Sequence, residues 1–382
     1  MFTAPPHPVA VPAIEQELSR LWQSAGEAQA HDAPAIMRAS VSNLVAFAPT
    51  RDEAVEASQK ITQLIQRHPC RAILLQVQPE LGPDETRAEV ALACQTAGDA
   101  QLCCEYICLS ACGLDGDQLP GATLPLLLTD LPTFLWWLGD PPFGSDEFLR
   151  LSEAADRLVV DTGRFRSPLS TFTELAMEVR RERYRTAVID LNWARLTPWR
   201  ALAARLFDSR EWRPYLDEID MVSIELNNRS ASIPANPIGA FLALGWLASR
   251  LGWRLDRHPV KVSDNRLTVT FHSAQREVTA RLDFIPGLPH GRLRSLRLEA
   301  GRSSPRAVFH ITRANDTPHA ETRVVVGDGE PIVRVAQYEH RGVAELLAEE
   351  MERLGRDTAF EEALKVADAV RAMLQVEIFV PV

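Results

Sequence analysis

The stretch TLPLLLTDLPTFLWWLGDPPF, residues 123–143, combines two adjacent tryptophans with very few charges. Two aspartates and several prolines interrupt it, so its apolar runs fall short of the roughly 18–20 residues that a membrane-spanning helix needs. The unbroken run PTFLWWLG (132–139) is instead typical of a central strand that helices bury on both faces. We therefore interpret Trp136 and Trp137 as core residues, with a ligand pocket as the alternative.

Apolar strands alternate with amphipathic helices on both sides of this run. Such alternation predicts an α/β fold with a doubly wound, mostly parallel, Rossmann-like sheet. The further strands are expected at 41–49, 71–78, 101–111, 156–162 and 185–191, and the helices at 12–28, 51–68, 120–129, 145–155 and 169–183.

The pattern changes near residue 193. Period-two alternation fills 264–327 and indicates an antiparallel sheet. Helices are expected before this region, at 198–208 and 237–252, and after it, at 340–354 and 358–374. We predict three parts: an N-terminal arm and helix (1–37), an α/β domain (38–192), and an α+β domain with an antiparallel sheet and C-terminal helices (193–382).

The composition is that of a globular protein, with 46% hydrophobic and 24% charged residues over 382 positions. The N-terminal sequence MFTAPPHPVAVP lacks the basic and apolar regions of a signal peptide, so we expect a cytoplasmic protein. The net charge of −10 makes nucleic acid an unexpected partner. No membrane partner is expected either.

Residues 250–313 depart from the acidic character of the whole chain. Thirteen basic and five acidic side chains give this region a local charge of +8. The region could steer the protein toward a charged protein partner, or it could be the solvated face of amphipathic strands. A nucleic-acid surface is a weaker alternative, because aromatic residues do not interleave with the arginines.

The common catalytic and nucleotide-binding motifs are missing from the sequence. There is no GxxxxGK[ST], no GxGxxG after a strand, no GxSxG and no HExxH. The sequence therefore assigns no catalytic residue, no cofactor-binding residue and no metal ligand.

Asp130 and Asp161 are the candidate ligand-binding residues, because both lie near strand ends of the first predicted domain. Ligands of doubly wound folds bind at the carboxyl ends of the strands. An enzyme or sensor that binds a sugar phosphate or nucleotide there is the alternative to a pure binding protein. Turn formation or helix capping would also account for Asp161.

Five of the six cysteines crowd into residues 94–112, without the paired spacing of a zinc site. We interpret them as free, buried, structural residues in a reducing compartment, with metal or redox chemistry as the alternative. They are Cys94, Cys103, Cys104, Cys108 and Cys112.

Five segments carry a resemblance to a known family. They are HPCRAILL (68–75), QLCCEYI (101–107), LPLLLTDLPTFLWWLGDPP (124–142), ADRLVVDT (155–162) and VIDLNWARLTPWRALAARLFD (188–208). The chain resembles OpcA, the glucose-6-phosphate dehydrogenase assembly protein family, from about residue 38 to beyond residue 325. The most specific part is LNWARLTPWR (191–200).

The resemblance implies a non-catalytic partner of glucose-6-phosphate dehydrogenase, the NADP-dependent enzyme that opens the oxidative pentose phosphate pathway. Family members are regarded as assembly factors or allosteric activators of that enzyme, and the family supplies no catalytic residues to transfer. Cyanobacterial members are linked to thioredoxin control through cysteines, some of them near the C-terminus. Here the tail VEIFVPV (376–382) has none, so we do not carry redox control over.

Trp193, Trp199 and Arg200 are the expected contacts with the dehydrogenase, because tryptophan and arginine dominate the energetics of protein interfaces. An inter-domain core is the alternative for both tryptophans. Thr197 and Pro198 predict a helix start, with threonine as the N-cap and proline as the first helical residue.

Overall fold

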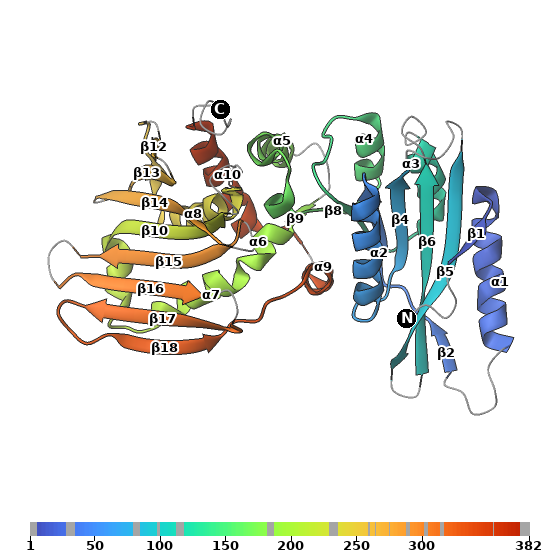
Figure 1. The fold of residues 1–382 in the computed structure, drawn as a ribbon, viewed down its shortest axis with the longest axis horizontal. Helices are drawn as coiled ribbons and strands as arrows, with labels where there is room; N and C mark the ends of the chain where they lie inside the picture. The colour runs from blue at the N-terminus through green and yellow to red at the C-terminus, as the bar shows by residue number, and fades with distance from the viewer. Residues whose placement is uncertain are drawn as a thin grey trace. The chain divides into compact units, whose positions relative to one another are not determined.

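The computed structural model describes most of the chain (Figure 1). Cys112, Asp264, Arg302 and the tail 376–382 lie outside the described residues. The described residues are 6–27, 35–78, 85–97, 100–111, 118–181, 187–228, 236–258, 260–263, 265–274, 276–287, 291–301, 305–313, 317–353 and 355–374.

The chain forms two compact units, and neither is continuous in sequence. The first contains Met1–Asp161, Glu178–Leu191 and Gly342–Arg356. The second contains Thr162–Met177, Asn192–Arg341 and Asp357–Val382. Each unit thus includes segments that lie beyond the boundaries drawn from the sequence at 38–192 and 193–382.

The first unit is built on sheet A, whose central strands run parallel in the order β6-β4-β3-β7-β8-β9. This is the order of a doubly wound fold, so the predicted α/β class is confirmed. The central strands are β3 (Asn43–Ala48), β4 (Arg71–Val77), β6 (Ala100–Ala111), β7 (Thr133–Trp137), β8 (Arg157–Val160) and β9 (Ala187–Asp190).

Three further strands extend sheet A beyond the prediction. β5 (Thr86–Ala97) forms an antiparallel hairpin with β6, where the alternating pattern of the fold would have placed a helix. β1 (His7–Val9) pairs with β5, and β2 (Ala35–Arg38) pairs with β6. The hairpin brings the cysteine-rich segment of β6 beside a second cysteine-bearing strand.

Helices accompany sheet A, and α2 contacts both β3 and β4. α9 belongs to this unit and lies against α2, although it follows the second sheet in sequence. The helices are α1 (Ile14–Glu27), α2 (Arg51–Ile65), α3 (Leu119–Thr123), α4 (Asp146–Glu153) and α9 (Val343–Glu352). Among the described residues no helix is both long and apolar enough to cross a membrane.

The paired tryptophans of β7 are core residues, as the sequence predicts. Trp136 and Trp137 are each only 2% exposed. The Trp137 ring stacks on Phe47 of β3 with 4.0 Å between ring centroids and meets Phe148 of α4 edge-on. The apolar run therefore fills the space between the sheet and its helices.

The second unit is built on sheet B, in the order β11-β13-β14-β10-β15-β16-β17-β18, with β12 paired to β13. Every pairing is antiparallel except that of β10 with β14. The strands are β10 (Ile219–Asn228), β11 (Arg254–Leu255), β12 (Lys261–Ser263), β13 (Arg266–His272), β14 (Glu277–Pro286), β15 (Leu293–Ala300), β16 (Ala307–Arg313), β17 (His319–Val326) and β18 (Ile332–Gln337).

Burial alternates along most strands of sheet B, because one face is covered and the other carries polar side chains. α8 and α10 pack closely together, and Gly245 of α8 lies directly against the backbone of Ala363. Gly252 ends α8 in the left-handed conformation. The helices are α6 (Leu191–Arg195), α7 (Thr197–Leu206), α8 (Ile238–Leu251) and α10 (Thr358–Ala372); α5 (Pro168–Arg181) has residues in both units.

Candidate protein-binding surface

The most family-specific segment, 191–200, folds as two short helices joined at Leu196. The predicted start of the second helix is wrong by one residue. Leu196 is the N-cap of α7, and its carbonyl accepts the Arg200 N–H, so Thr197 is already helical. The Thr197 hydroxyl instead accepts a hydrogen bond from the Arg200 guanidinium at 2.9 Å. This contact holds Arg200 against the turn between the helices.

Trp193 is buried at the centre of this arrangement, with 2% of its surface exposed. Its indole N–H donates to Asp357 Oδ2 at 2.8 Å, and Asp357 in turn caps the N-terminus of α10. The Arg200 guanidinium lies 3.5 Å from the centre of the indole ring. A cation this close to a tryptophan face is stabilised by the ring quadrupole.

Trp199 is also buried, at 3% exposed, and meets Tyr338 edge-on with 5.9 Å between ring centroids. Arg313 lies 4.3 Å from the Tyr338 ring. Burial raises the pKa of the Tyr338 hydroxyl above its ordinary value. The two tryptophans therefore tie the α6–α7 turn to α10 and to the end of sheet B.

The structure buries both indoles in the interior, and half-buried Arg200 lies over the Trp193 ring. Their part in partner binding stays a prediction. In this arrangement the rings would act by shaping the surface above them.

That surface contains an open cavity of about 300 Å³ between α7 and the chain that follows β18. Its lining combines charged and polar side chains with apolar ones. The lining residues are Thr197, Pro198, Ala201, Leu202, Arg205, Gln337, Glu339 and Arg341. The family-specific segment and the end of sheet B thus share one concave site.

The basic region 250–313 is partly neutralised by acidic side chains of the second unit. Arg306 bonds Asp220 at 3.0 Å and Glu299 at 2.9 Å, and Arg297 bonds Glu299 at 2.9 Å. Arg266 pairs with Asp283, and Arg250 with Glu362. Asp283 and Glu299 are already counted in the local charge of +8, so only Asp220 and Glu362, which lie outside residues 250–313, offset part of that excess.

Asp130 and Asp161 lie at opposite ends of two neighbouring parallel strands of sheet A, β7 and β8. Asp161 directly follows β8 at the carboxyl edge, where it is 8% exposed. Asp130 precedes β7, at the amino edge, and adopts a positive φ of 68° in an exposed turn. A single pocket that uses both carboxylates is incompatible with this placement, and the turn-forming role accounts for Asp130.

A doubly wound fold binds a dinucleotide in the crevice between the two strands that correspond here to β3 and β7. In this chain the first turn of α2, which follows β3, forms hydrogen bonds within itself. The Thr50 hydroxyl accepts from the Glu53 N–H at 3.3 Å and donates to the Glu53 carboxylate at 2.7 Å. Glu53 Oε1 also stands 3.0 Å from the position of a Cβ on Gly139. A carboxylate thus sits where a pyrophosphate would need uncovered N–H groups.

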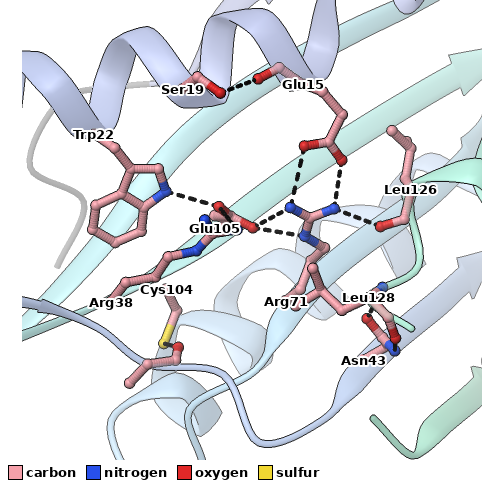
Figure 2. A network of polar contacts seen from close by, with 11 residues as sticks. Glu15, Ser19, Trp22, Arg38, Asn43, Arg71, Cys104, Glu105, Leu126 and Leu128 are labelled. Atoms are coloured by element: carbon pink, nitrogen blue, oxygen red, sulfur yellow. Dashed lines mark hydrogen bonds and ion pairs between the residues drawn. The ribbon is translucent and has the colours of Figure 1, made fainter. Parts of the chain in front are cut away.

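A buried ion pair between Arg71 and Glu105 anchors α1 to sheet A (Figure 2). Arg71 also bonds the Leu126 carbonyl at 2.6 Å and Glu15 of α1 at 2.6 Å. Glu105 accepts from the Trp22 indole N–H at 2.7 Å, and Arg38 pairs with it at 2.8 Å. Sequence reasoning missed this network, because the ion pair joins residues that are distant in the chain.

The free-thiol expectation is wrong for Cys94 and Cys103, which form a disulfide. They stand directly opposite each other in the β5–β6 hairpin, with 4.0 Å between Cα atoms. Leu21, Trp22 and Ala25 of α1 pack over them. The bond could not be expected without the hairpin, because β5 is not predicted.

Cys104 and Cys108 are free and buried, as the sequence predicts, and Cys70 is free and buried as well. Burial raises the pKa of the Cys104 thiol to about 11 and that of Cys108 to about 12. Burial also raises the pKa of Cys70. These thiols remain protonated near neutral pH, where a nucleophilic cysteine would be a thiolate.

The two halves of the chain match two protein-family domains. Residues 61–177 match the glucose-6-phosphate dehydrogenase subunit N-terminal domain, and residues 186–364 match the C-terminal domain of the same subunit. Among solved structures, scyllo-inositol dehydrogenase from Lactobacillus casei is similar at 10% identity with a TM-score of 0.47, covering 88% of this chain and 97% of that one.

Three cyanobacterial proteins, each named OxPP cycle protein OpcA, are curated relatives of this chain. The Nostoc punctiforme protein is 33% identical over 78% of this chain, and the Synechocystis protein is 30% identical over 81%. The Synechococcus elongatus protein is 30% identical over 78% of this chain. The chain spans 64%, 65% and 67% of the length of these three relatives. The chain belongs to the OpcA family.

Proposed function

We propose that this member of the OpcA family binds glucose-6-phosphate dehydrogenase and promotes its active form without catalysing a reaction of its own. The observation that carries the proposal is the match of residues 61–177 and 186–364 to the two domains of a glucose-6-phosphate dehydrogenase subunit. The name of the curated relatives points to the same oxidative pentose phosphate context.

An activator of this kind acts through differential affinity. It must bind the active conformation or assembly of the enzyme more tightly than the inactive one. A coupling free energy of about 1–3 kcal/mol changes the populations several-fold or more, and no covalent chemistry is required. The buried, protonated thiols and the Glu53 carboxylate bonded within the first turn of α2 support a non-catalytic role.

The cavity beside α7 is the proposed docking site for the dehydrogenase. Trp193 and Trp199 are buried beneath the α6–α7 turn, and the Arg200 guanidinium packs on the Trp193 ring. Arg205 then presents an exposed charge at the cavity wall, opposite the chain that carries Arg341. Arginines at a concave site suit an acidic partner segment.

Gel filtration and enzyme assay with the dehydrogenase from the same genome test this proposal. We expect the two proteins to elute together and kcat/KM of the dehydrogenase to rise. Arg205→Glu should raise the dissociation constant of the complex at least tenfold, so that less of the dehydrogenase elutes with the variant. Arg210→Glu, an exposed arginine outside the cavity, is the matched control and should behave as wild type. Failure of the wild-type chain to co-elute or to change kcat/KM would overturn the proposal.

A sugar-phosphate or nucleotide sensor is the competing function. Melting temperatures with glucose 6-phosphate, 6-phosphogluconate and NADP separate the two, because a ligand that binds the folded state raises the midpoint. We expect no ligand-dependent rise, since Asp130 and Asp161 lie at opposite ends of the strands and the Glu53 carboxylate lies close to Gly139 at the end of β7.

A further inference from the structure

One face of sheet B is open, and its strands lie side by side in the order that Figure 1 shows. Along β14, Leu282 is buried while Arg281 is exposed and Asp283 partly exposed, so both charged side chains lie on the open face. Residues opposite each other in neighbouring strands point to the same face of a sheet. The strand registers therefore show which side chains form a row across the open face.

A row of basic side chains crosses the open face, and it contains no acidic residue. Burial and the neighbouring Arg297 lower the pKa of His310 below its ordinary value, so the charge of the row at neutral pH comes from lysine and arginine. From β12 to β18 this cationic row consists of Lys261, Thr268, Arg281, Ser223, Arg297, His310, Arg323 and Val333.

An acidic row runs beside the cationic row, two residues away along each strand, which is about 6.8 Å. Glu225 and Asp283 are direct neighbours in it, on the parallel strands β10 and β14. Like charges at such neighbouring positions are unfavourable unless a cation lies above them. From β12 to β18 the acidic row consists of Ser263, Arg266, Asp283, Glu225, Ser295, Thr312, Glu321 and Val335.

Ion pairs within the chain neutralise only part of this pattern. Pairs at an exposed surface are weak and leave their charges accessible to a partner. Arg281 and Glu225 form no ion pair with another described residue. The exposed pairs on the open face are Arg266 with Asp283, Arg297 with Glu299, and Arg323 with Glu321.

A second copy of this chain carries the complementary pattern. A two-fold axis that runs across the strands, midway between the rows, places the cationic row of one copy over the acidic row of the other. Arg281 then faces Asp283 of the second copy, and Ser223 faces Glu225 of the second copy. Because the axis is two-fold, each contact is made twice.

The nearest alternative axes fit the charges less well. An axis parallel to the strands sets the cationic row over itself, and an axis on either row sets Arg281 over Arg281 or Asp283 over Asp283. An axis between Arg281 and Thr279 places Asp283 over Glu277. An axis between Asp283 and Ile285 places Arg281 beyond the end of β14, without an acidic residue to face. Since facing like charges oppose association, the pattern favours the axis between the two rows.

The open face is large enough for a stable dimer. From β13 to β18 the sheet takes six steps between neighbouring strands, and β13 is seven residues long. At about 4.8 Å a step and about 3.3 Å a residue, the flat area is roughly 650–700 Å². A standard interface removes about 800 Å² of accessible surface from each partner, and protruding side chains raise the accessible area above the flat one. On the edge strand β18, Val333 and Val335 are 45% and 68% exposed and add apolar surface.

We propose that two copies of the chain pack the open faces of sheet B against each other, about a two-fold axis between the cationic and acidic rows. Packed sheets cross at about −30°, so facing residues match best near the middle of the sheet. β10 and β14 are among the central strands, which makes Arg281 and Asp283 the contact to test. Lys261, Arg281 and Arg297 of the basic region 250–313 contribute to this interface.

Sedimentation velocity of the purified chain measures the dimer. We expect Arg281→Glu to raise the dissociation constant at least tenfold, because it sets two carboxylates against each other at each contact. Asp283→Arg should do the same with two guanidinium groups. Arg210→Glu, an exposed arginine outside sheet B, is the control and should dimerise as wild type does. Melting temperatures should show that all three variants are folded. A monomeric wild type, or an Arg281→Glu dimer of unchanged affinity, would overturn the proposal.

An equimolar mixture of Arg281→Glu and Asp283→Arg tests the facing contact itself. In the mixed dimer one contact joins the introduced carboxylate to the introduced guanidinium, and the other is the native pair of Arg281 with Asp283. We expect the mixture to associate within a few-fold of wild type, although each variant alone does not. A mixture that associates no better than the separate variants would show that these positions do not face each other, which contradicts the axis.

Gel filtration with the dehydrogenase separates this interface from enzyme binding. If Arg281→Glu breaks the dimer but still co-elutes with the dehydrogenase, self-association is supported and is independent of the proposed function. If the wild-type chain is monomeric and Arg281→Glu abolishes co-elution, the dehydrogenase occupies the open face and the dimer proposal is wrong.

Discussion

Arg71 Nε donates to Glu105 Oε2 at 2.6 Å, and the two side chains are 3% and 1% exposed. A charge pair this deeply buried is stable only because each partner is satisfied by the other and by further bonds. Arg71 reaches Glu15, and Glu105 reaches Trp22, so both charges hold α1 in place. The pair therefore links the N-terminal helix to the centre of sheet A.

Removal of one charge from this pair should strongly destabilise the fold. Glu105→Gln keeps the shape of the side chain but leaves the Arg71 guanidinium without its buried counterion. We expect the free energy of unfolding to fall by about 3–5 kcal/mol. Urea denaturation measures it. Glu15→Gln alters a partner that is 54% exposed and should cost no more than about 1 kcal/mol. Equal losses in the two variants would contradict the buried-pair account.

The Cys94–Cys103 disulfide should contribute to stability, because it closes the β5–β6 hairpin in the unfolded chain. The two residues are nine positions apart, and closure of so short a loop corresponds to about 2–3 kcal/mol. Reduction should lower the melting temperature of wild type and of Cys108→Ala. It should leave the double variant Cys94→Ala, Cys103→Ala unchanged. A reductant effect that persists in the double variant would assign the stabilisation to another thiol.

Gly245 permits α8 and α10 to approach closely. A Cβ at this position would run into the backbone carbonyl of Ala363, which cannot move without shifting α10. Gly245→Ala should therefore lower the free energy of unfolding by about 2–3 kcal/mol. Gly26→Ala in α1 meets no atom within 4 Å and should cause no loss. Chemical denaturation of both variants checks the contrast, which a neutral Gly245→Ala would refute.

His68 should make stability depend on pH. Its ring is buried and contacts the Ser42 hydroxyl at 3.1 Å, and burial lowers the pKa of the imidazole below its ordinary value. The unfolded chain then binds the proton more readily, so the contribution of His68 is present above pH ~6.5 and is lost as pH falls below it.

Unfolding midpoints at pH 7.5 and 5.5 measure this dependence. His68→Gln should show a smaller loss on acidification than wild type, by no more than about 1.4 kcal/mol per pH unit for one proton. Ser42→Ala keeps the buried imidazole and should retain most of the wild-type slope. An identical slope in His68→Gln and wild type would show that other groups dominate.

The sequence predicts those elements of sheet A whose burial is complete. Strands such as β3 and β7 are apolar at nearly every position because helices cover both faces, and that pattern is readable without structure. β5 escapes prediction because arginine and glutamate mix with small residues along it. β18 escapes because its strand is largely exposed on both faces, so no periodicity marks it.

The candidate surface is predictable in its residues but not in its geometry. Tryptophan and arginine at 193, 199 and 200 attract attention by residue type alone. Whether an indole faces a partner or the interior depends on residues far along the chain, such as Asp357 and Tyr338. The exposed edge at β18 could not be foreseen for a similar reason, since exposure depends on which strand lies next to it.

The division of the chain has a practical consequence for making fragments. The backbone passes from one compact unit to the other at 161/162, 177/178, 191/192, 341/342 and 356/357. No single truncation therefore yields a self-sufficient half. A C-terminal piece starting at 193 would lack 162–177 and would carry 342–356 without the helix α2 that it packs on. To express either unit alone, its separate chain segments would have to be joined by new linkers in place of the native connections through the other unit.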